Sequence, residues 1–404
     1  MGSFFSDEHK KNIAALDKNK QSEIRRWKND ADAIQKALDA VDKELKGAAQ
    51  LWKYEPSAEF KDGTLTETYC RIALSIGDLD TAQFVVFIVP GTTHSVNGSI
   101  LTDKNSDFGS LPGPADISKG GTLVNLVSEN AIPLYEKCKN LNSSKKCAVV
   151  LWMGYRAPMA ELRGPGIWAF AIDGAQKLIA DVLQFKEKSQ ARLTISGHSY
   201  GSTTVGTAAK HFKKLPNSTP LADSLVLLGS PGACAMKANE LGPPEEIYVC
   251  SDYYDIITYL AAFGRDPAAK QFGAVTLKSK VPGLAFKRDD WMVYLLKWGA
   301  RRIFGGTTSH SYYYHPKNPS SESIARVVIQ EGVGDVKKCA GRSLMGSWSE
   351  KKFNWNLMFA ALRSVGISPA VWKDQDLIGA AAIAYIGNNF APQEENNPNE
   401  EPAS

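Results

Sequence analysis

A chain of 404 residues with 47 basic and 43 acidic side chains has a net charge of +4 and a charged fraction of 22%. This balance argues against the strongly basic surface of a nucleic-acid-binding protein, and the length permits about two or three ordinary domains or one large domain with appendages. The six cysteines include no Cys-x-x-Cys pair, which argues against a structural zinc site and against a disulfide scaffold.

The amino-terminal region, residues 1–62, is predicted to be helical. Between residues 7 and 50, apolar side chains recur at three- and four-residue steps, the pattern of an amphipathic helix or helical hairpin. Two roles stay open for these helices. They bind a partner protein, similar to the helical leaders of specialised actinobacterial secretion substrates, or they pack on the rest of the chain.

No segment has the features of a general secretory signal or a membrane span. Residues 1–10 contain no apolar stretch of signal-peptide length, and the longest late apolar run, 377–386, is much shorter than the roughly 20 residues of a membrane helix. We expect a soluble protein without a transmembrane segment, either cytoplasmic or exported by a specialised route.

Residues 63–335 carry the pattern of an α/β domain. Nearly continuous apolar runs predict strands at 69–76, 84–89, 148–153, 192–196, 224–228 and 246–250, and helical stretches lie between them at 123–139, 169–186 and 202–214. Buried parallel strands with helices on both faces of the sheet are the inference.

Three later segments are assigned by composition. An aromatic, basic stretch at 280–304 is either a lid over an acyl pocket or a helix docked on the core. Residues 336–390 are predicted to form a helical extension, and 391–404, rich in Asn, Glu and Pro, a disordered tail.

The segment 197–201, with the sequence GHSYG, lies between a predicted strand and a predicted helix. A strand that turns abruptly into a helix requires glycine on both sides of the central residue, because the two flanks pass too close for a Cβ. Such a turn presents the central hydroxyl at the carboxyl end of the sheet, at the positive end of the helix. Ser199 is therefore a candidate nucleophile.

A nucleophilic serine needs a base, and a carboxylate usually orients that base, in the chain order Ser, acid, His for this kind of turn. Two candidate acids follow the predicted strand 246–250: Asp255, preferred because two branched apolar residues follow it, and Asp252, otherwise a turn residue. Of the histidines after the serine, His310 on a glycine-rich loop is preferred and His315 is the alternative. His211 is interpreted as an ordinary cation at a helix carboxyl terminus.

Two backbone donors are needed to hold an oxyanion. We expect one to be the N–H of Tyr200, and the other the N–H of Thr92, where Gly91 lets the chain turn after the predicted strand 84–89. The candidate substrate-pocket residues are Gly91, His198, Tyr155 and Trp291. No metal or cofactor is predicted, because histidines and carboxylates do not cluster at ligand spacing and no nucleotide-binding glycine pattern follows a strand.

Four segments together resemble an actinobacterial α/β-hydrolase family of largely unassigned function: 196–202 (SGHSYGS), 228–232 (LGSPG), 151–158 (LWMGYRAP) and 310–312 (HSY). The resemblance spans about residues 74–314. It implies the α/β-hydrolase fold, a serine hydrolase with Ser199, Asp255 and His310 in the usual roles, and an amino-terminal helical region. The chain departs from the family at the acid loop, where Asp-Ile-Ile replaces the common Asp-Pro-Val.

The leading hypothesis is therefore a hydrolase of the esterase or lipase type acting on a small-molecule or lipid ester. An amidase, thioesterase or acyltransferase would use the same residues, and a non-catalytic binding or secretion-associated protein on the same scaffold is the alternative from another class. Cys138 and Cys147 bracket a polar turn and are either a bridge, in a protein working outside the cell, or two free thiols.

Overall fold

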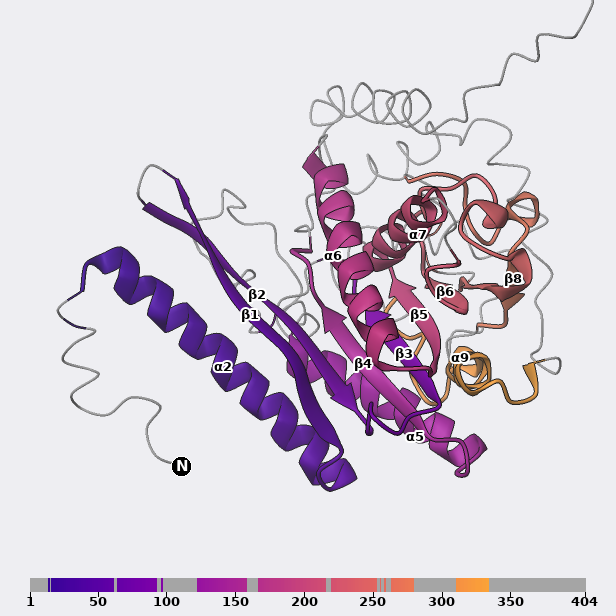
Figure 1. The fold of residues 1–404 in the computed structure, drawn as a ribbon, viewed down its shortest axis with the longest axis horizontal. Helices are drawn as coiled ribbons and strands as arrows, with labels where there is room; N and C mark the ends of the chain where they lie inside the picture. Colours follow the sequence, from indigo (N-terminus) through magenta and orange to yellow (C-terminus); the bar gives the residue numbers. More distant parts are fainter. Residues whose placement is uncertain are drawn as a thin grey trace, which may run out of the picture.

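The computed structural model describes residues 14, 16–61, 64–92, 96, 122–157, 166–215, 219–252, 255, 258, 263–279 and 310–333. Their centre is an eight-stranded sheet with the order β1-β2-β4-β3-β5-β6-β7-β8 (Figure 1). The strands are β1 (Ala49–Lys61), β2 (Thr64–Ile76), β3 (Phe84–Val89), β4 (Cys147–Met153), β5 (Arg192–His198), β6 (Ser224–Leu228), β7 (Ile247–Cys250) and β8 (Val275–Leu277). All pairs from β4 to β8 are parallel, whereas β2 pairs antiparallel with both β1 and β4. This confirms the predicted mostly parallel sheet.

The side chains of each central strand alternate between two cores, one on each face of the sheet. In β3, Val85 and Phe87 are buried in one core, while Val86 and Ile88 are buried in the other. Helices α6 (Gly166–Lys188) and α7 (Tyr200–Lys213) cover the first face, and α2 (Lys18–Leu45), α4 (Leu123–Leu126), α5 (Ile132–Leu141) and α9 (Pro319–Ile329) the second. Burial on both faces explains why these strands are continuous apolar runs in the sequence.

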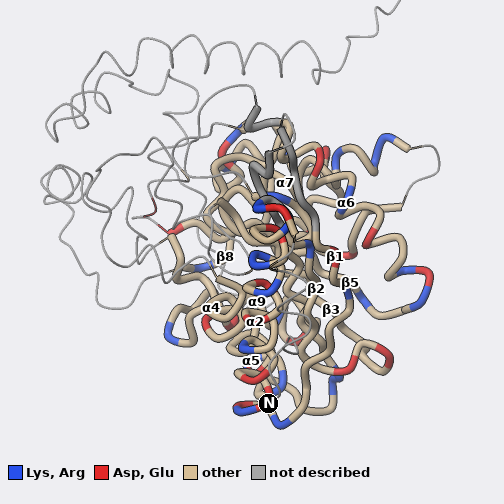
Figure 2. The backbone as a smooth tube through the Cα atoms, turned by 90° about the vertical axis from the view of Figure 1, so that its left-hand side faces the viewer, with Lys and Arg blue, Asp and Glu red and all other residues tan. Residues whose placement is uncertain are grey.

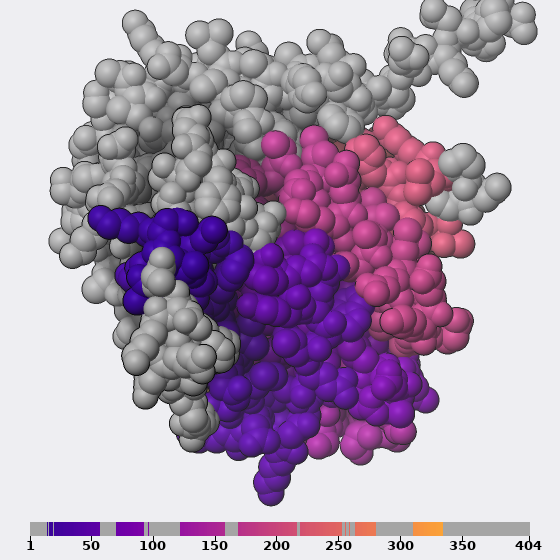
Figure 3. All heavy atoms as spheres, turned by 60° about the vertical axis from the view of Figure 1, so that its left-hand side comes forward, coloured from indigo at the N-terminus to yellow at the C-terminus, as the bar shows by residue number. Residues whose placement is uncertain are grey.

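The amino-terminal helix α2 packs on the chain's own sheet. In Figure 3 these amino-terminal residues, coloured indigo and purple, lie side by side. The Asp17 side chain caps it by accepting a hydrogen bond from the Lys20 N–H at 2.9 Å. Ile34, Ala37 and Val41, spaced three and four residues apart, are buried against the core that includes β2. Binding of a partner protein by the amino-terminal region stays a prediction.

Strand β1 differs from the predicted helical region 1–62. Helix α2 ends where Lys46 and Gly47 adopt positive φ values of 54° and 88°, and residues 49–61 then pair with β2. As the edge strand, β1 tolerates Pro56 and several charged residues, so it lacks the apolar pattern of a central strand. The sequence also does not reveal β8, which is only three residues long.

Several predictions fall outside the described residues: the lid or docked helix at 280–304 with Trp291, the extension 336–390 and the tail 391–404.

Within the described part of the chain, no helix combines the length and the apolar content that crossing a bilayer demands. Along that same part, Lys and Arg are interspersed with Asp and Glu (Figure 2).

Candidate active site

The turn between β5 and α7 places Ser199 in a strained conformation. Its φ of 53° and ψ of −129° lie outside the regions that side-chain-bearing residues prefer, and such strain costs about 1–3 kcal/mol. Three hydrogen bonds hold it: the Ser199 N–H donates to the Leu228 carbonyl at 2.8 Å, and the Ser199 carbonyl accepts from the Ser202 hydroxyl at 2.6 Å and from the Ser202 N–H at 2.9 Å. The side chain of Ser199 thereby occupies a fixed position between strand and helix.

Both glycines of this turn are required by close approach. A Cβ at Gly201 would lie 2.2 Å from the Val89 carbonyl oxygen, and one at Gly197 would lie 2.7 Å from Ser202 Cα. These contacts with backbone atoms cannot be relieved by a rotamer change, so the sequence-based reason for the two glycines is the observed one.

The loop after β3 lies directly against the serine. A Cβ built on Gly91 would be 2.6 Å from Ser199 Cβ and 3.1 Å from Ser199 Oγ. On the other side, Tyr200 begins α7, and its ring is buried edge-on against Phe263, with ring centroids 5.4 Å apart. The structure thus brings together the loop and the helix start from which the two oxyanion donors are expected.

His310 and Asp255, far apart in the sequence, form a close pair. The two carboxylate oxygens of Asp255 lie 2.8 and 2.9 Å from His310 Nδ1, and the Asp255 side chain is completely buried. Burial acts to raise the pKa of Asp255, but the neighbouring His310 and the hydrogen bonds from His310 and Tyr313 outweigh it, so the pKa is lowered from its ordinary value. The carboxylate is therefore ionised beside the imidazole.

Tyr313 holds the Asp255 carboxylate in place. Its hydroxyl donates to Asp255 Oδ2 at 2.5 Å and accepts the Asp252 backbone N–H at 3.1 Å. Burial and the negative charge of Asp255 raise the pKa of Tyr313, which keeps the hydroxyl protonated as a donor. Of the two candidate acids, Asp255 faces the histidine, while Asp252 contacts Tyr313 through its backbone.

The His310 backbone is held by the residue that precedes the serine. His198 Nε2 lies 2.6 Å from the His310 carbonyl oxygen, so this nitrogen carries a proton and donates it. Gly229, with φ of 54°, lies against both members of the Asp255–His310 pair. A Cβ at this position would lie 2.8 Å from Asp255 Oδ2 and 3.0 Å from His310 Nδ1, so no larger residue fits there.

A family model described as Alpha/beta hydrolase matches residues 66–265. The match places residues 66–265 in the α/β-hydrolase family. This confirms the resemblance deduced from the sequence motifs. The matched residues include Ser199 and Asp255, and His310 lies beyond them.

Among known proteins, this chain is similar to Rv2079 and MT2140, uncharacterized proteins from two strains of Mycobacterium tuberculosis. Each is 28% identical over 347 residues, covering 78% of this chain and 44% of the relative, so the chain spans less than half the length of the relatives it matches. Similar solved structures include a fungal esterase from Rhizomucor miehei (12% identity, 67% of this chain and 90% of that one, TM-score 0.30) and an α/β hydrolase from the metagenome of Lake Arreo (12% identity, 59% and 77%, TM-score 0.32).

Three further residues singled out in the sequence, Tyr155, His315 and His211, lie apart from the Asp255–His310 pair. Tyr155, a candidate for the substrate pocket, is buried in the core, where its hydroxyl donates to the Pro90 carbonyl at 2.8 Å. His315 stacks on Tyr312, with ring centroids 4.0 Å apart. His211 is exposed in the last turn of α7, as its interpretation as a terminal cation requires.

The sequence analysis assigned no role to the residues that support Asp255 and His310. Tyr313 follows His310 by three positions in an aromatic segment, and Gly229 begins the GSPG motif, so both were visible as sequence features without an assigned role. Their function depends on contacts with Asp255 that only the folded chain creates.

No group of three or more His, Cys, Asp or Glu side chains suited to a metal ion occurs among the residues whose placement the structure describes. Cys138 and Cys147 are buried free thiols, at the end of α5 and the start of β4.

Proposed function

We propose that the protein is a serine hydrolase of the esterase or lipase type, which cleaves the carboxylic ester of a small molecule or lipid through an acyl-enzyme. The geometry of His310 is the main support. An ionised carboxylate can only accept hydrogen bonds, so Asp255 at 2.8 and 2.9 Å requires a proton on His310 Nδ1 and makes Nε2 the basic nitrogen.

In the proposed reaction, Ser199 Oγ attacks the ester carbonyl while His310 Nε2 removes the hydroxyl proton. Asp255 stabilises the imidazolium that forms, and His310 then protonates the departing alcohol. A water molecule, deprotonated by the same nitrogen, attacks the acyl-enzyme. As the bond between the acyl carbon and Ser199 Oγ breaks, His310 returns the proton to Ser199 Oγ and the acid is released.

The backbone around Ser199 suits the charge that develops on the substrate oxygen. The Tyr200 N–H belongs to the first turn of α7, where the helix end is positive, and the Thr92 N–H follows the Gly91 backbone that packs against Ser199. Each such donor contributes about 10²–10³-fold to kcat in hydrolases of this kind.

Substitution of the nucleophile tests the proposal. Ser199→Ala is expected to abolish hydrolysis of p-nitrophenyl esters and covalent labelling by a fluorophosphonate probe, because the substitution removes the proposed nucleophile, Ser199 Oγ. Ser144→Ala, at an exposed turn before β4, is the matched control and should behave as wild type. Full labelling of Ser199→Ala would overturn the proposal, and absence of wild-type labelling would favour the non-catalytic binding scaffold.

The leaving group and acyl chain are separate questions, because amidases, thioesterases and acyltransferases use the same set of residues. Rates with matched ester, thioester and anilide substrates, each from acetyl to octanoyl, would rank these activities. A preference for anilides over esters would replace the esterase assignment by an amidase one.

A further inference from the structure

The segment 152–155, with the sequence WMGY, has no part in the chemistry proposed above, yet it contacts the loop that packs against Ser199. The Tyr155 hydroxyl donates to the Pro90 carbonyl at 2.8 Å, and Pro90 immediately precedes Gly91. Since proline has no N–H, the backbone between β3 and Gly91 lacks one donor with which to anchor itself. The carbonyl that Tyr155 binds is therefore a major point of attachment for this loop.

Tyr155 is itself held by its neighbours. Its ring stacks on Trp152, with centroids 5.9 Å apart and planes 14° from parallel. A Cβ at Gly154 would lie 2.3 Å from the Trp152 ring, so the chain can turn back over the indole only with glycine at this position. The Tyr155 ring also packs on the backbone of Gly174 in α6, where a Cβ would lie 2.8 Å from it. These contacts leave the ring one orientation.

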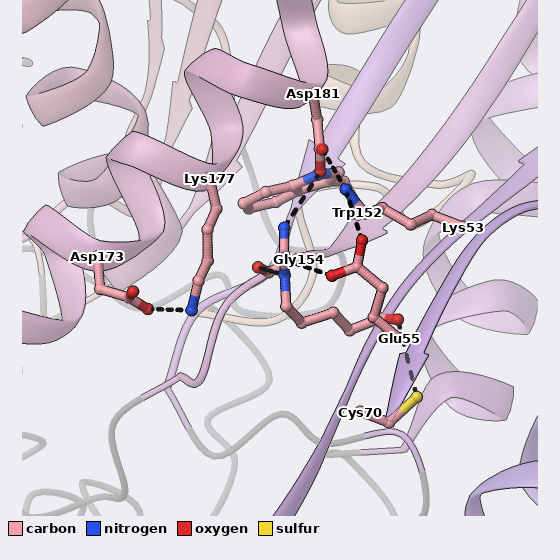
Figure 4. A network of polar contacts seen from close by, with 9 residues as sticks. Lys53, Glu55, Cys70, Trp152, Gly154, Asp173, Lys177 and Asp181 are labelled. Atoms are coloured by element: carbon pink, nitrogen blue, oxygen red, sulfur yellow. Dashed lines mark hydrogen bonds and ion pairs between the residues drawn. The ribbon is translucent and has the colours of Figure 1, made fainter. Parts of the chain in front are cut away.

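Charged side chains in the protein interior hold Trp152 and Gly154 in place (Figure 4). Trp152 Nε1 donates to Asp181 Oδ2 at 2.7 Å, and Arg71 Nε donates to the Gly154 carbonyl at 2.7 Å. Asp181 is ion-paired with Lys53 at 2.5 Å and lies 3.7 Å from Arg71. The segment 152–155 is thus attached to β2 and α6 by hydrogen bonds with charged partners, which are stronger than neutral ones, and Lys53 of β1 pairs with the α6 partner, Asp181.

We propose that Tyr155 is a positioning residue that fixes the loop 90–92 against Ser199. Its catalytic consequence rests on the proposed function, because the loop supplies an oxyanion donor only if an oxyanion forms. Burial raises the pKa of Tyr155, so the hydroxyl remains a donor throughout the working pH range. Displacement of a reacting group by about 1 Å can cost about 10²-fold in rate, so a loosened loop lowers kcat even when the substrate still binds.

The variant Tyr155→Phe tests the proposal by removing one hydroxyl and leaving the stacked ring. The matched control is Tyr314→Phe, because the Tyr314 hydroxyl is equally buried and hydrogen-bonded, to Ser196 Oγ at 2.7 Å, but does not contact the loop. The first measurement is hydrogen–deuterium exchange of the Gly91 and Thr92 amides in the full-length protein. We expect exchange about 5–10-fold faster in Tyr155→Phe than in wild type and unchanged in Tyr314→Phe.

The second measurement separates positioning from general destabilisation. In Tyr155→Phe, kcat for p-nitrophenyl ester hydrolysis should fall about 10-fold with KM within about twofold, and the affinity for a trifluoromethyl ketone, which forms a tetrahedral adduct, should fall in proportion. Tyr314→Phe should lower the thermal stability of the protein without lowering kcat for ester hydrolysis.

The two measurements fail independently. If wild-type protein hydrolyses no ester, the proposed function is overturned, and the exchange rates alone still decide the positioning role. If the Gly91 and Thr92 amides exchange equally in wild type and Tyr155→Phe, or if the two variants change kcat alike, Tyr155 is only a structural residue and the inference is overturned.

Discussion

Asp255 and Asp181 are both almost completely buried carboxylates, with 0% and 2% of the residue exposed, but their partners differ. Asp181 is paired with the ammonium group of Lys53 and lies beside the guanidinium group of Arg71. Asp255 is paired with the imidazole of His310, the type of side chain that most often acts as a general acid or base. Equal burial therefore serves stability in one place and suits proton transfer in the other, and the partner decides which.

Their positions in the fold agree with this difference. Asp181 lies within helix α6, against β1 and β2, where the backbone on all sides is part of regular structure. Asp255 lies in the loop after β7, at the carboxyl edge of the parallel strands. In open α/β sheets this edge is where ligands bind, because the loops there are free to vary while the strands hold them in place.

The largest expected effect comes from Asp255→Asn. The amide can donate to His310 Nδ1 and so favours the wrong tautomer, and kcat/KM should fall about 10³–10⁴-fold with the folded state retained. Ester hydrolysis and circular dichroism of the same preparation measure both. Asp252→Asn is the matched control from the same loop and should reduce activity far less, whereas an equal loss in both variants would contradict the distinct role of Asp255.

The converse is expected of Asp181→Asn. Asparagine keeps an acceptor for Trp152 Nε1 but leaves Lys53 and Arg71 without the buried negative charge, so the free energy of unfolding should fall by about 3 kcal/mol with little change in kcat. Urea unfolding measures the first and ester hydrolysis the second.

The control for that comparison is Asp173→Asn on the same helix. Asp173 is half-exposed and pairs with Lys177 across one helical turn, and such a pair contributes less than about 1 kcal/mol. If Asp181→Asn is no more destabilising than Asp173→Asn, then the buried charges around Asp181 do not stabilise the fold.

A third buried carboxylate, Asp30 on α2, is expected to affect the pH dependence of stability and not the catalytic rate. Burial raises the pKa of Asp30 to about 7, whereas in the unfolded chain an aspartate titrates near about 3.9. Between these values the folded state binds the proton and the unfolded state does not, so stability falls as the pH rises from about 4 to 7.

Asparagine at position 30 removes this dependence. In Asp30→Asn, the free energy of unfolding at pH 8 should rise by about 4 kcal/mol relative to wild type, since one pKa unit corresponds to about 1.4 kcal/mol, and the difference should vanish at pH 4. Urea titrations across this range test the slope, and Asp39→Asn, at an exposed position on the same helix, is the control. An unchanged slope in Asp30→Asn would show that Asp30 is not the group responsible.

Local sequence determined a large part of this protein. The strands β3 and β6 have the bounds that their apolar runs predict, because burial on both faces leaves a continuous signal. The turn around Ser199 could also be predicted from the sequence, because the requirement for glycine at positions 197 and 201 arises largely within one short stretch of chain. The family resemblance rests on the same short motifs and is confirmed.

Tertiary structure decided how the distant segments meet. Asp255 and Asp252 are near neighbours in one loop, and only the folded chain places Asp255 against His310 and turns the backbone of Asp252 towards Tyr313. Tyr155 resembled a pocket residue in the sequence but is buried beneath the loop at Pro90. Periodicity and local steric limits act between residues a few positions apart, so they are visible in the sequence, whereas these hydrogen bonds join residues tens of positions apart and exist only once the sheet has brought its loops together.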